Sequence, residues 1–443
     1  MKLIRHIIPV DIDKNQKLII NSLNGLMDKV DANVFELLTK WRSCNEIIPV
    51  GEFETGIYNS LMTRGYLTES QEAENAIKQK IIEKLRAYHK SNASKCNHIT
   101  FVMTYNCNFR CHYCFEGKSN VKKEVITPEQ IDAALALSGG DLLTVGLFGG
   151  EPLLPATRTS LEYLISKTYN KQFNITTNGY YLEEFFDLLS PLKFSSIMVT
   201  LDGDEKSHNS RRYLANGKPT YQKIMQGIQK YLENRMPICI RMNVDKSNIK
   251  SVQNIKASLI QRFNKYKEFL TFELSPMLDA THEERTQVHK QLYSNDVGFS
   301  NEEKQQRNRM LGKFRPIVNA ISVGSRVRPT YSTCHAHYGN SILVDPFGLI
   351  YPCLVAVGKE ELAVGTYYPE VNYKENSIFT RNIETIPECS NCVYSLLCGG
   401  GCPLSLPSYQ NVCKPACASI RNQIHNILPQ LYQMNNSAEA VSV

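Results

Sequence analysis

The sequence has no apolar run of the length that a bilayer requires. Of its 443 residues, 42% are hydrophobic and 21% charged, and no stretch reaches the roughly 18 consecutive apolar residues of a membrane span. The first residues make a poor secretory signal, because Arg5, His6 and Asp11 interrupt their apolar run. We therefore expect a cytoplasmic protein with no membrane partner.

The sequence also lacks a block of basic residues. Its 50 Lys and Arg and 43 Asp and Glu give a net charge of only +7, and the basic residues are spread along the chain. A nucleic-acid-binding surface requires stronger and more clustered positive charge. We therefore expect no nucleic-acid partner, whereas an acidic peptide is compatible with this charge.

Cysteine, in contrast, is abundant, with 14 in the chain. Without an export signal, a reducing cytosol disfavours structural disulfides, so metal binding is the leading explanation. Cys44, Cys96 and Cys239 stand alone and are expected to be core residues. The others form two groups, three at 107–114 and eight at 334–417.

The first 97 residues predict a small domain followed by a connecting helix. Residues 18–30 are typical of a hairpin around Asn24-Gly25, residues 32–41 of an amphipathic helix, and residues 60–68 of a helix end and wing-like strand. These patterns predict a winged-helix-like domain over 1–72. The charged residues 73–97 predict a helical linker.

From residue 98, apolar runs rich in Val, Ile, Phe and Thr alternate with helical segments. The expected strands are 98–106, 142–150, 173–179, 195–203, 237–245 and 269–277. The expected helices between them are 128–138, 158–169, 182–190, 221–234 and 252–263. This alternation predicts an α/β fold with a parallel sheet, as a partial (β/α)6 TIM-like barrel over 98–280. Its functional residues should lie at the C-terminal ends of the strands.

The remaining chain divides into three expected parts. The polar residues 281–333 predict a helical bridge. Residues 334–420, rich in Cys and Gly, predict a loop-rich C-terminal domain. Residues 421–443 predict a final helix and a disordered tail.

Cys107, Cys111 and Cys114 follow the first expected strand with the spacing CxxxCxxC. Three thiolates can hold three irons of a [4Fe–4S] cluster and leave the fourth iron for another ligand. With Tyr113 before the last cysteine, the motif resembles the signature of the radical S-adenosylmethionine (SAM) superfamily. The resemblance implies that SAM chelates the fourth iron and is cleaved reductively to methionine and a 5'-deoxyadenosyl radical. A zinc knuckle completed by His112 is the alternative.

Two further strand ends resemble motifs of the same superfamily. Gly149-Gly150-Glu151-Pro152 resembles its GGEP turn, which implies that the glycines admit the methionine moiety of SAM and that Glu151 accepts from its ammonium group. An ordinary Gly-Gly turn is the alternative. Thr177-Asn178-Gly179 resembles its TNG element, which adds Asn178 to the expected SAM site.

The later strand ends add candidates for the same site. Thr200-Leu201-Asp202-Gly203 resembles the SLDG element with Thr for Ser, so Thr200 is a candidate ligand of the methionine carboxylate. Arg212 is a candidate for a bidentate contact to that carboxylate, and Arg211 is equally placed by sequence. Asn243 is a candidate for the SAM ribose, with strand capping as the alternative. The resemblance covers residues 98–280.

The second cysteine group has the spacing C-x13-G-x4-C, followed by C-x2-C-x5-C-x3-C and two more cysteines. This pattern resembles the SPASM extension, a domain with two auxiliary [4Fe–4S] clusters in radical SAM enzymes that act on peptides. The alternative is a zinc ribbon. The resemblance implies Cys334, Cys353 and Cys402 as ligands of cluster I, and Cys389, Cys392 and Cys398 as ligands of cluster II, completed by Cys413 or Cys417.

Cluster I lacks an obvious fourth thiolate. Some relatives have one more cysteine shortly after the first, where this sequence has His335 and His337. Either a substrate thiolate occupies the open position, or the spare one of Cys413 and Cys417 closes it. The two histidines are candidate ligands in principle, although loop histidines are more often hydrogen-bonded or exposed to solvent.

Two features bear on the reaction. Sulfatase maturases usually carry Asp after the Cys of the Tyr-Pro-Cys turn, whereas Cys353 is followed by Leu354. Residues 1–72 resemble the winged-helix element that binds leader peptides through a sheet edge.

We therefore expect a radical SAM enzyme that modifies a ribosomally made precursor peptide, most naturally by a thioether or other side-chain cross-link. Its leader would bind the N-terminal domain, and a flavodoxin or ferredoxin would supply electrons. The alternatives are sulfatase-maturase-like oxidation of a protein Cys or Ser, peptide epimerisation, or a non-catalytic iron–sulfur electron-transfer or binding module. No residue is singled out as catalytic acid or base.

Overall fold

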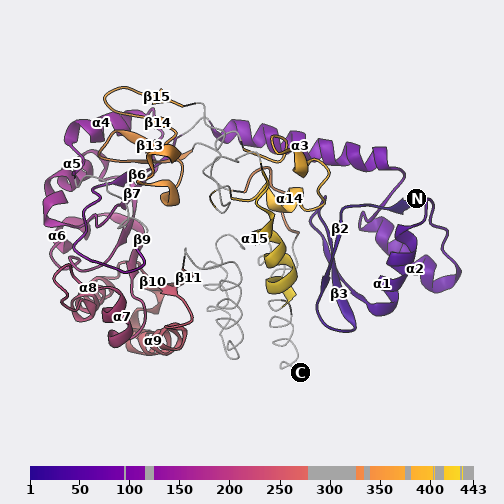
Figure 1. Cartoon of the computed structure of the whole chain (residues 1–443), viewed down its shortest axis with the longest axis horizontal. Coiled ribbons are helices and arrows are strands. Elements are labelled where there is room, and N and C mark those ends of the chain that lie inside the picture. Colours follow the sequence, from indigo (N-terminus) through magenta and orange to yellow (C-terminus); the bar gives the residue numbers. More distant parts are fainter. Residues whose placement is uncertain are drawn as a thin grey trace. The chain divides into compact units, whose positions relative to one another are not determined.

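The computed structural model describes residues 1–93, 96–114, 124–277, 326–333, 340–374, 381–402, 404, 414–429 and 432. The chain forms two compact units. The first comprises residues 1–92, 296–337 and 380–443, and the second comprises residues 93–295 and 338–379 (Figure 1). The expected helical bridge falls largely within 278–325, and this stretch, the C-terminal tail, Cys334 and Cys413 lie outside the described residues.

The second unit is built on a parallel sheet. Its strands are β6 (His98–Val102), β7 (Thr144–Phe148), β8 (Gln172–Thr177), β9 (Lys193–Thr200), β10 (Ile238–Val244) and β11 (Leu270–Pro276). They pair in chain order, each parallel to the next. Ile99, Phe101 and Val145 are fully buried, as expected where helices cover a parallel sheet. The predicted partial barrel is confirmed.

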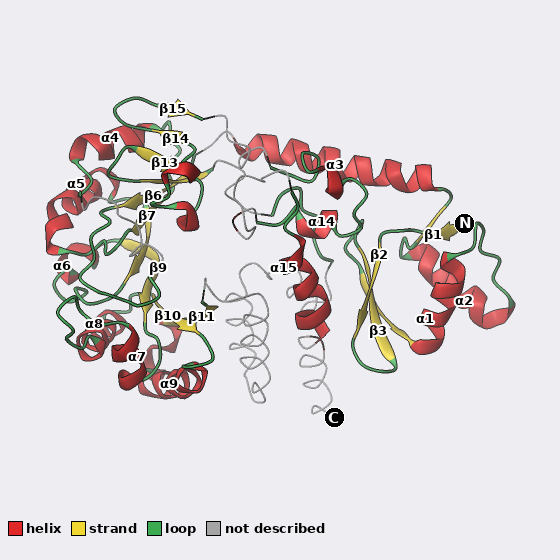
Figure 2. Ribbon diagram, in the orientation of Figure 1, coloured by secondary structure: helices red, strands yellow, loops and turns green. Residues whose placement is uncertain are grey.

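Helices connect these strands and lie along one side of them (Figure 2). They are α4 (Pro128–Ala136), α5 (Arg158–Thr168), α6 (Phe186–Leu189), α7 (Glu205–Arg211), α8 (Tyr221–Glu233) and α9 (Ile249–Arg262). A capping box between Thr127 and Gln130 begins α4. We did not expect α7, although Asp204 caps it by accepting from the backbone N–H of Ser207 at 2.8 Å.

The sheet continues beyond the barrel strands. β12 (Ser341–Val344) pairs parallel with β6, and β13 (Leu349–Tyr351), β14 (Gly365–Thr366) and β15 (Asn372–Tyr373) follow in antiparallel order. Part of the segment that we expected to be loop-rich therefore extends the barrel sheet. Ile342, Leu343 and Val344 are buried in it, but a run this short gives a weak strand signal in the sequence.

The first unit begins with small sheets and helices. β1 (Lys2–Leu3) pairs with β5 (Leu67–Thr68), and β2 (Ile7–Asp11), β3 (Gln16–Asn21) and β4 (Met27–Asp31) form an antiparallel meander. α1 (Ala32–Arg42), α2 (Gly51–Thr63) and α3 (Gln71–Ala93) follow. The predicted hairpin is confirmed. Its Gly25 has φ +75°, and a Cβ there would lie 1.8 Å from the Val327 carbonyl oxygen.

The cysteine-rich part of this unit consists of short elements. They are the 3-10 turn η7 (Pro387–Cys389), α14 (Ser395–Cys398), α15 (Cys417–Asn422) and the π turn η9 (Gln423–Ile427). One apolar cluster joins this part to the N-terminal helices and strands, because Trp41 and Tyr66 share it with Ile386 and Leu396. Within the described chain, no helix is long and apolar enough to span a membrane.

Candidate active site

Cys107, Cys111 and Cys114 lie in the loop after β6, each partly exposed. Burial raises the pKa of Cys107 to about 12, and the nearby Glu151 carboxylate and Cys111 thiol act in the same direction. Burial also raises the pKa of Cys111, which lies near Cys114. Free thiolates are therefore disfavoured here, whereas iron coordination deprotonates a thiol outright.

Three cysteines are a donor set that a [4Fe–4S] cluster can use. In the described ranges, no three His, Cys, Asp or Glu side chains are placed to hold one metal ion together. A [4Fe–4S] cluster binds each thiolate through a different iron, which suits three cysteines spread along one loop. Asn178 reaches the same loop, since its Nδ2 lies 3.8 Å from the Cys107 Sγ.

The two glycines of the GGEP turn let the chain pack against the start of the cysteine loop. A Cβ on Gly149 would lie 2.3 Å from the Thr104 carbonyl oxygen, and one on Gly150 would lie 2.4 Å from that of Asn106. Gly149 also has φ +134°, which a side chain disfavours. The structure therefore explains both glycines by backbone approach, and their contact with SAM stays a prediction.

Glu151 is fully buried and binds the turn after β8. Its Oε1 accepts from the Thr177 hydroxyl at 2.6 Å, and its Oε2 accepts from the Asn178 backbone N–H at 2.7 Å. Burial raises the pKa of Glu151, and these hydrogen bonds oppose the rise. Glu151 therefore orients the TNG turn, while its predicted contact with the SAM ammonium group is untested. Pro152, beside it, is buried and accepts from Thr157.

Tyr113 is the centre of a polar cluster at the ends of β9 and β10. Its hydroxyl is hydrogen-bonded to the Asp202 carboxylate, and it accepts from Arg212 Nη1 at 2.6 Å and from Asn243 Nδ2 at 3.2 Å. Asn243, the penultimate residue of β10, therefore points its side chain into this cluster. Thr200 is buried at the end of β9.

The structure separates Arg211 from Arg212. Arg211 Nη1 lies 2.7 Å from the Asp245 carboxylate, and its Nε lies 3.6 Å from that of Asp202. Arg212 instead lies near Cys111, and its positive charge opposes the rise in the pKa of that thiol. The Nε atoms of both arginines lack a hydrogen-bond partner among the described residues, but Arg212 is the one that binds Tyr113 in the cysteine loop by a hydrogen bond.

Sequence reasoning assigned no role to Asp202 or His208, which hold this cluster together. Asp202 is fully buried, and its carboxylate accepts from the Asn243 backbone N–H at 2.9 Å. Its own N–H donates to His208 Nδ1 at 3.2 Å, and His208 Nε2 lies 3.1 Å from the Thr220 hydroxyl. Burial holds the pKa of His208 well below its ordinary value. In the sequence, the acidic residue of Thr200-Leu201-Asp202-Gly203 was the feature that could have indicated the role of Asp202.

In the first unit, Cys389, Cys392, Cys398 and Cys417 come together. Burial raises the pKa of Cys389 to about 11 and that of Cys398 to about 12, and nearby thiols of the same group add to both shifts. Cys417 is thus the described candidate for completing cluster II. Cys353 follows β13 and Cys402 follows Gly401, and both are partly exposed.

Comparison with known proteins identifies the barrel. Residues 101–257 match the radical SAM superfamily. The barrel is therefore a radical SAM domain. This family implies a [4Fe–4S] cluster and SAM, which confirms these two expected cofactors and the expected enzyme class.

Several relatives are similar over much of the chain. A cysteine-type anaerobic sulfatase-maturating enzyme of Clostridium novyi is 25% identical over 324 residues, which cover 67% of this chain and 85% of that protein. The radical SAM cyclopropyl synthase TigE of Paramaledivibacter caminithermalis is 19% identical over 430 residues, 88% of this chain and 87% of that protein. The AdoMet-bound structure of anSMEcpe shares the fold, with a TM-score of 0.56, 19% identity and coverage of 77% of this chain and 99% of that one.

Proposed function

We propose that this enzyme matures a ribosomally made precursor peptide, using the 5'-deoxyadenosyl radical to form a thioether or another side-chain cross-link. The observation that carries the proposal is the second group of gathered thiols, Cys389, Cys392, Cys398 and Cys417, in a chain that also has a radical SAM site. Two similar proteins are named for maturing a sulfatase and for cyclopropyl synthesis, and one anSMEcpe structure holds AdoMet with a peptide.

In the barrel, Cys107, Cys111 and Cys114 hold the first cluster, and the strand-end residues receive SAM. A reduced [4Fe–4S] cluster held there would supply the electron for reductive cleavage of SAM. In this proposal, Arg212 donates to the methionine carboxylate and Asn243 binds the ribose. Gly149 and Gly150 keep the GGEP turn against the loop that carries the cysteines.

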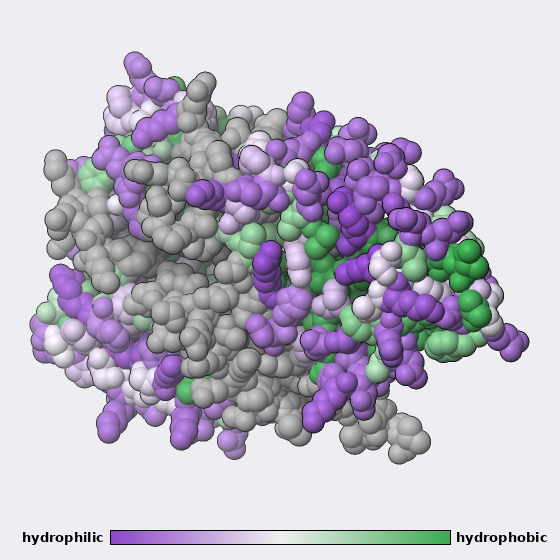
Figure 3. Space-filling view, turned by 45° about the vertical axis from the view of Figure 1, so that its right-hand side comes forward, coloured by the Kyte–Doolittle hydropathy of each residue, from purple (hydrophilic) through white to green (hydrophobic). Residues whose placement is uncertain are grey.

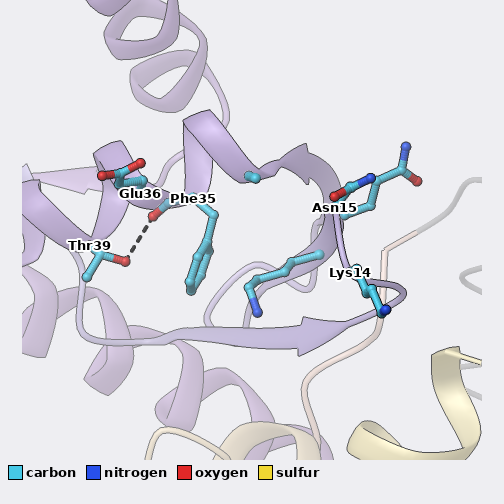
Figure 4. Close-up of a pocket in the computed structure, with 8 residues that line it drawn as sticks. Lys14, Asn15, Phe35, Glu36 and Thr39 are labelled. Carbon is cyan, nitrogen blue, oxygen red and sulfur yellow. Dashed lines mark hydrogen bonds between the residues drawn. The ribbon is translucent and has the colours of Figure 1, made fainter.

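The leader peptide binds the N-terminal domain. β4 is an end strand of the meander among the described residues, so a peptide strand can add to its free edge. Beside this sheet, a cavity of about 290 Å³ lies between the β2–β3 turn and α1, where Figure 4 shows Lys14 and Asn15 across from Phe35 and Glu36. Lys14, at the rim of this cavity, suits an acidic leader peptide.

Exposed apolar side chains mark the same domain as an interaction surface. Ile48 and Val50, just before α2, and Phe53, in its first turn, are 74%, 72% and 58% exposed, and Figure 3 shows apolar surface in this part of the molecule. Contiguous exposed apolar area is typical of sites that bind another chain.

The auxiliary clusters serve the second half of the reaction. Joining a thiol to a carbon removes two hydrogens and two electrons from the peptide. One hydrogen atom would go to the deoxyadenosyl radical, the thiol proton would go to solvent, and an auxiliary cluster would accept the remaining electron. If Cys417 completes cluster II, cluster I has Cys334, Cys353 and Cys402, and its fourth iron can bind the substrate thiolate.

Sulfatase-maturase-like oxidation is the second candidate, because the 25% identity to such an enzyme extends over 324 residues. Leu354 weighs against it. This residue stands where those maturases usually have Asp, and it is 42% exposed at the start of a 3-10 turn.

The test is turnover of the anaerobic enzyme with peptides encoded next to its gene. A cross-linked product lacks the mass of two hydrogen atoms, and tandem mass spectrometry locates the bond. The variant with Cys107, Cys111 and Cys114 changed to Ala is the control and should form no deoxyadenosine. Deoxyadenosine formation with no modified peptide, or oxidation of a sulfatase Cys in its place, would refute the maturase proposal.

The leader site needs its own test. Lys14→Glu should raise the precursor concentration required for half-maximal rate and leave uncoupled SAM cleavage unchanged, because docking supplies local concentration. Lys80→Glu, an exposed position on α3, is the matched control. Equal behaviour of the two variants would remove this docking site.

A further inference from the structure

Lys78 is a buried lysine beside the second group of cysteines. It lies on α3, is 5% exposed, and its Nζ donates to the Ser390 carbonyl oxygen at 2.6 Å. Ser390 stands in the loop between Cys389 and Cys392, and the thiols of both cysteines are close enough to act on the Lys78 charge. The ammonium group therefore points into the loop that supplies two of the proposed cluster ligands.

Among the described residues, no carboxylate forms a salt bridge with this ammonium group, although the charge of Glu74 acts on it more weakly than the thiols of Cys389 and Cys392 do. Glu74, one turn earlier on α3, is occupied: its Oε1 accepts from the backbone N–H of Arg5 at 2.9 Å and is hydrogen-bonded to the buried His6 ring. Its Oε2 accepts from Gln71 at 3.2 Å. The Lys78 charge is thus left facing the cysteine loop.

A buried ammonium group requires a compensating anion. Removing a charge from water is costly unless another charge and hydrogen bonds replace the solvent, and one carbonyl oxygen is only a partial replacement. Burial accordingly lowers the pKa of Lys78. An iron–sulfur cluster bound by four thiolates carries net negative charge, so it is an anion of the required kind at the required place.

We propose that Lys78 is the countercharge of the auxiliary cluster bound by Cys389, Cys392, Cys398 and Cys417, and that it raises the reduction potential of this cluster. The inference rests on the proposed function for the existence of that cluster. One-electron reduction adds one negative charge to the cluster, and a fixed positive charge nearby stabilises the reduced form more than the oxidised form. Lys78 acts on the cluster electrostatically and takes no direct part in the reaction of the peptide.

The test is a redox titration followed by electron paramagnetic resonance. The full chain is used with Cys107, Cys111 and Cys114 changed to Ala, so that the signals come from the auxiliary clusters. In this background, Lys78→Gln should lower the ratio of reduced to oxidised cluster at a fixed potential roughly tenfold, which is about 59 mV for a one-electron couple. Only one of the two auxiliary signals should move.

Two variants separate charge from structure. Lys78→Arg keeps the positive charge and should stay near the parent potential. Lys80→Gln removes a charge from an exposed position of the same helix, where solvent screens it, and should also leave the potential unchanged. Equal shifts in Lys78→Gln and Lys78→Arg, or no shift in either, would overturn the assignment.

Iron and sulfide analysis covers the remaining outcomes. If Lys78→Gln loses one cluster and Lys78→Arg keeps it, the charge is required for assembly and the proposal stands. If both lose it while Lys80→Gln keeps it, the role is structural and the proposal fails. If the parent background holds a single cluster and a single signal, the cluster of the proposed function is itself absent, and the inference fails with it.

Discussion

Glu151 and Asn178 are joined by a hydrogen bond of 2.7 Å from the Asn178 backbone N–H to the buried Glu151 carboxylate. This bond holds the turn after β7 to the turn after β8. The side chain of Asn178 then reaches the cysteine loop, with its Nδ2 2.8 Å from Asn108 Oδ1. Two strand-end motifs thus act as one support for the loop that binds the first cluster.

Glu151→Gln should therefore lower the rate of SAM cleavage by tenfold or more. The new amide group must turn a donor toward either the Asn178 N–H or the Thr177 hydroxyl, and an unsatisfied buried donor costs about 1–3 kcal/mol. Deoxyadenosine formation measures the effect, and iron content shows that the cluster is still assembled. Glu162→Gln, on the exposed face of α5, is the control. A rate equal to that of the control would contradict the supporting role.

Arg212 and Arg211 should respond differently to replacement by Lys. Arg212→Lys should weaken SAM binding about tenfold, because Lys cannot make a bidentate contact with a carboxylate. Arg211→Lys should mainly lower thermal stability, because it weakens the contacts with Asp245 and Asp202. Equilibrium dialysis with SAM and thermal unfolding distinguish the two effects. The reverse pattern would assign the SAM contact to Arg211.

His208 should make the stability of the barrel sensitive to mild acid. Its pKa is depressed in the folded state, so the unfolded state binds the proton more readily. The stability it contributes is therefore complete above the unfolded pKa of about 6.5 and falls as the pH drops below it, by up to about 1.4 kcal/mol per pH unit. Urea unfolding measured by circular dichroism should show a weaker acid dependence for His208→Gln. A constant difference between the two proteins from pH 8 to 5.5 would contradict this.

Cys417 and Cys413 should differ in their effect on cluster content. Cys417 lies with Cys389 and Cys398, so Cys417→Ala should lose about four irons and one auxiliary signal, or leave that cluster labile. Cys413→Ala should keep both auxiliary clusters if cluster I has an open site. Iron and sulfide analysis of anaerobic preparations decides between them. If only Cys413→Ala loses a cluster, Cys413 and not Cys417 is the residue that completes cluster II.

A Cys-containing precursor should perturb one auxiliary-cluster signal if cluster I binds the substrate thiolate. The sulfur would become a ligand of its fourth iron, which changes the electronic structure of the cluster. Electron paramagnetic resonance of the reduced enzyme with the precursor, and with its Cys-to-Ser version as control, tests this. Identical spectra with the two peptides would contradict thiolate binding and would favour a carbon–carbon or carbon–oxygen cross-link over a thioether.

The sequence by itself determined the barrel and the first cysteine site. The barrel strands are apolar runs separated by amphipathic helices, a pattern that local propensity and periodicity report directly. Cys107, Cys111 and Cys114 are close along the chain, so one loop brings them together whatever surrounds it. The hairpin at Asn24-Gly25 was readable for the same reason, because turn chemistry is local.

Only the tertiary structure decided the contacts between distant parts of the chain. Arg211 and Arg212 are neighbours in sequence, yet Arg211 pairs with the Asp245 carboxylate and Arg212 donates to the Tyr113 hydroxyl, because the helix ends at Arg211 and Arg212 has an extended backbone. Lys78 and Ser390 are 312 residues apart, and no periodicity links them. Such contacts depend on how the elements pack. The role of a buried charged side chain can therefore be assigned only when its neighbours are known.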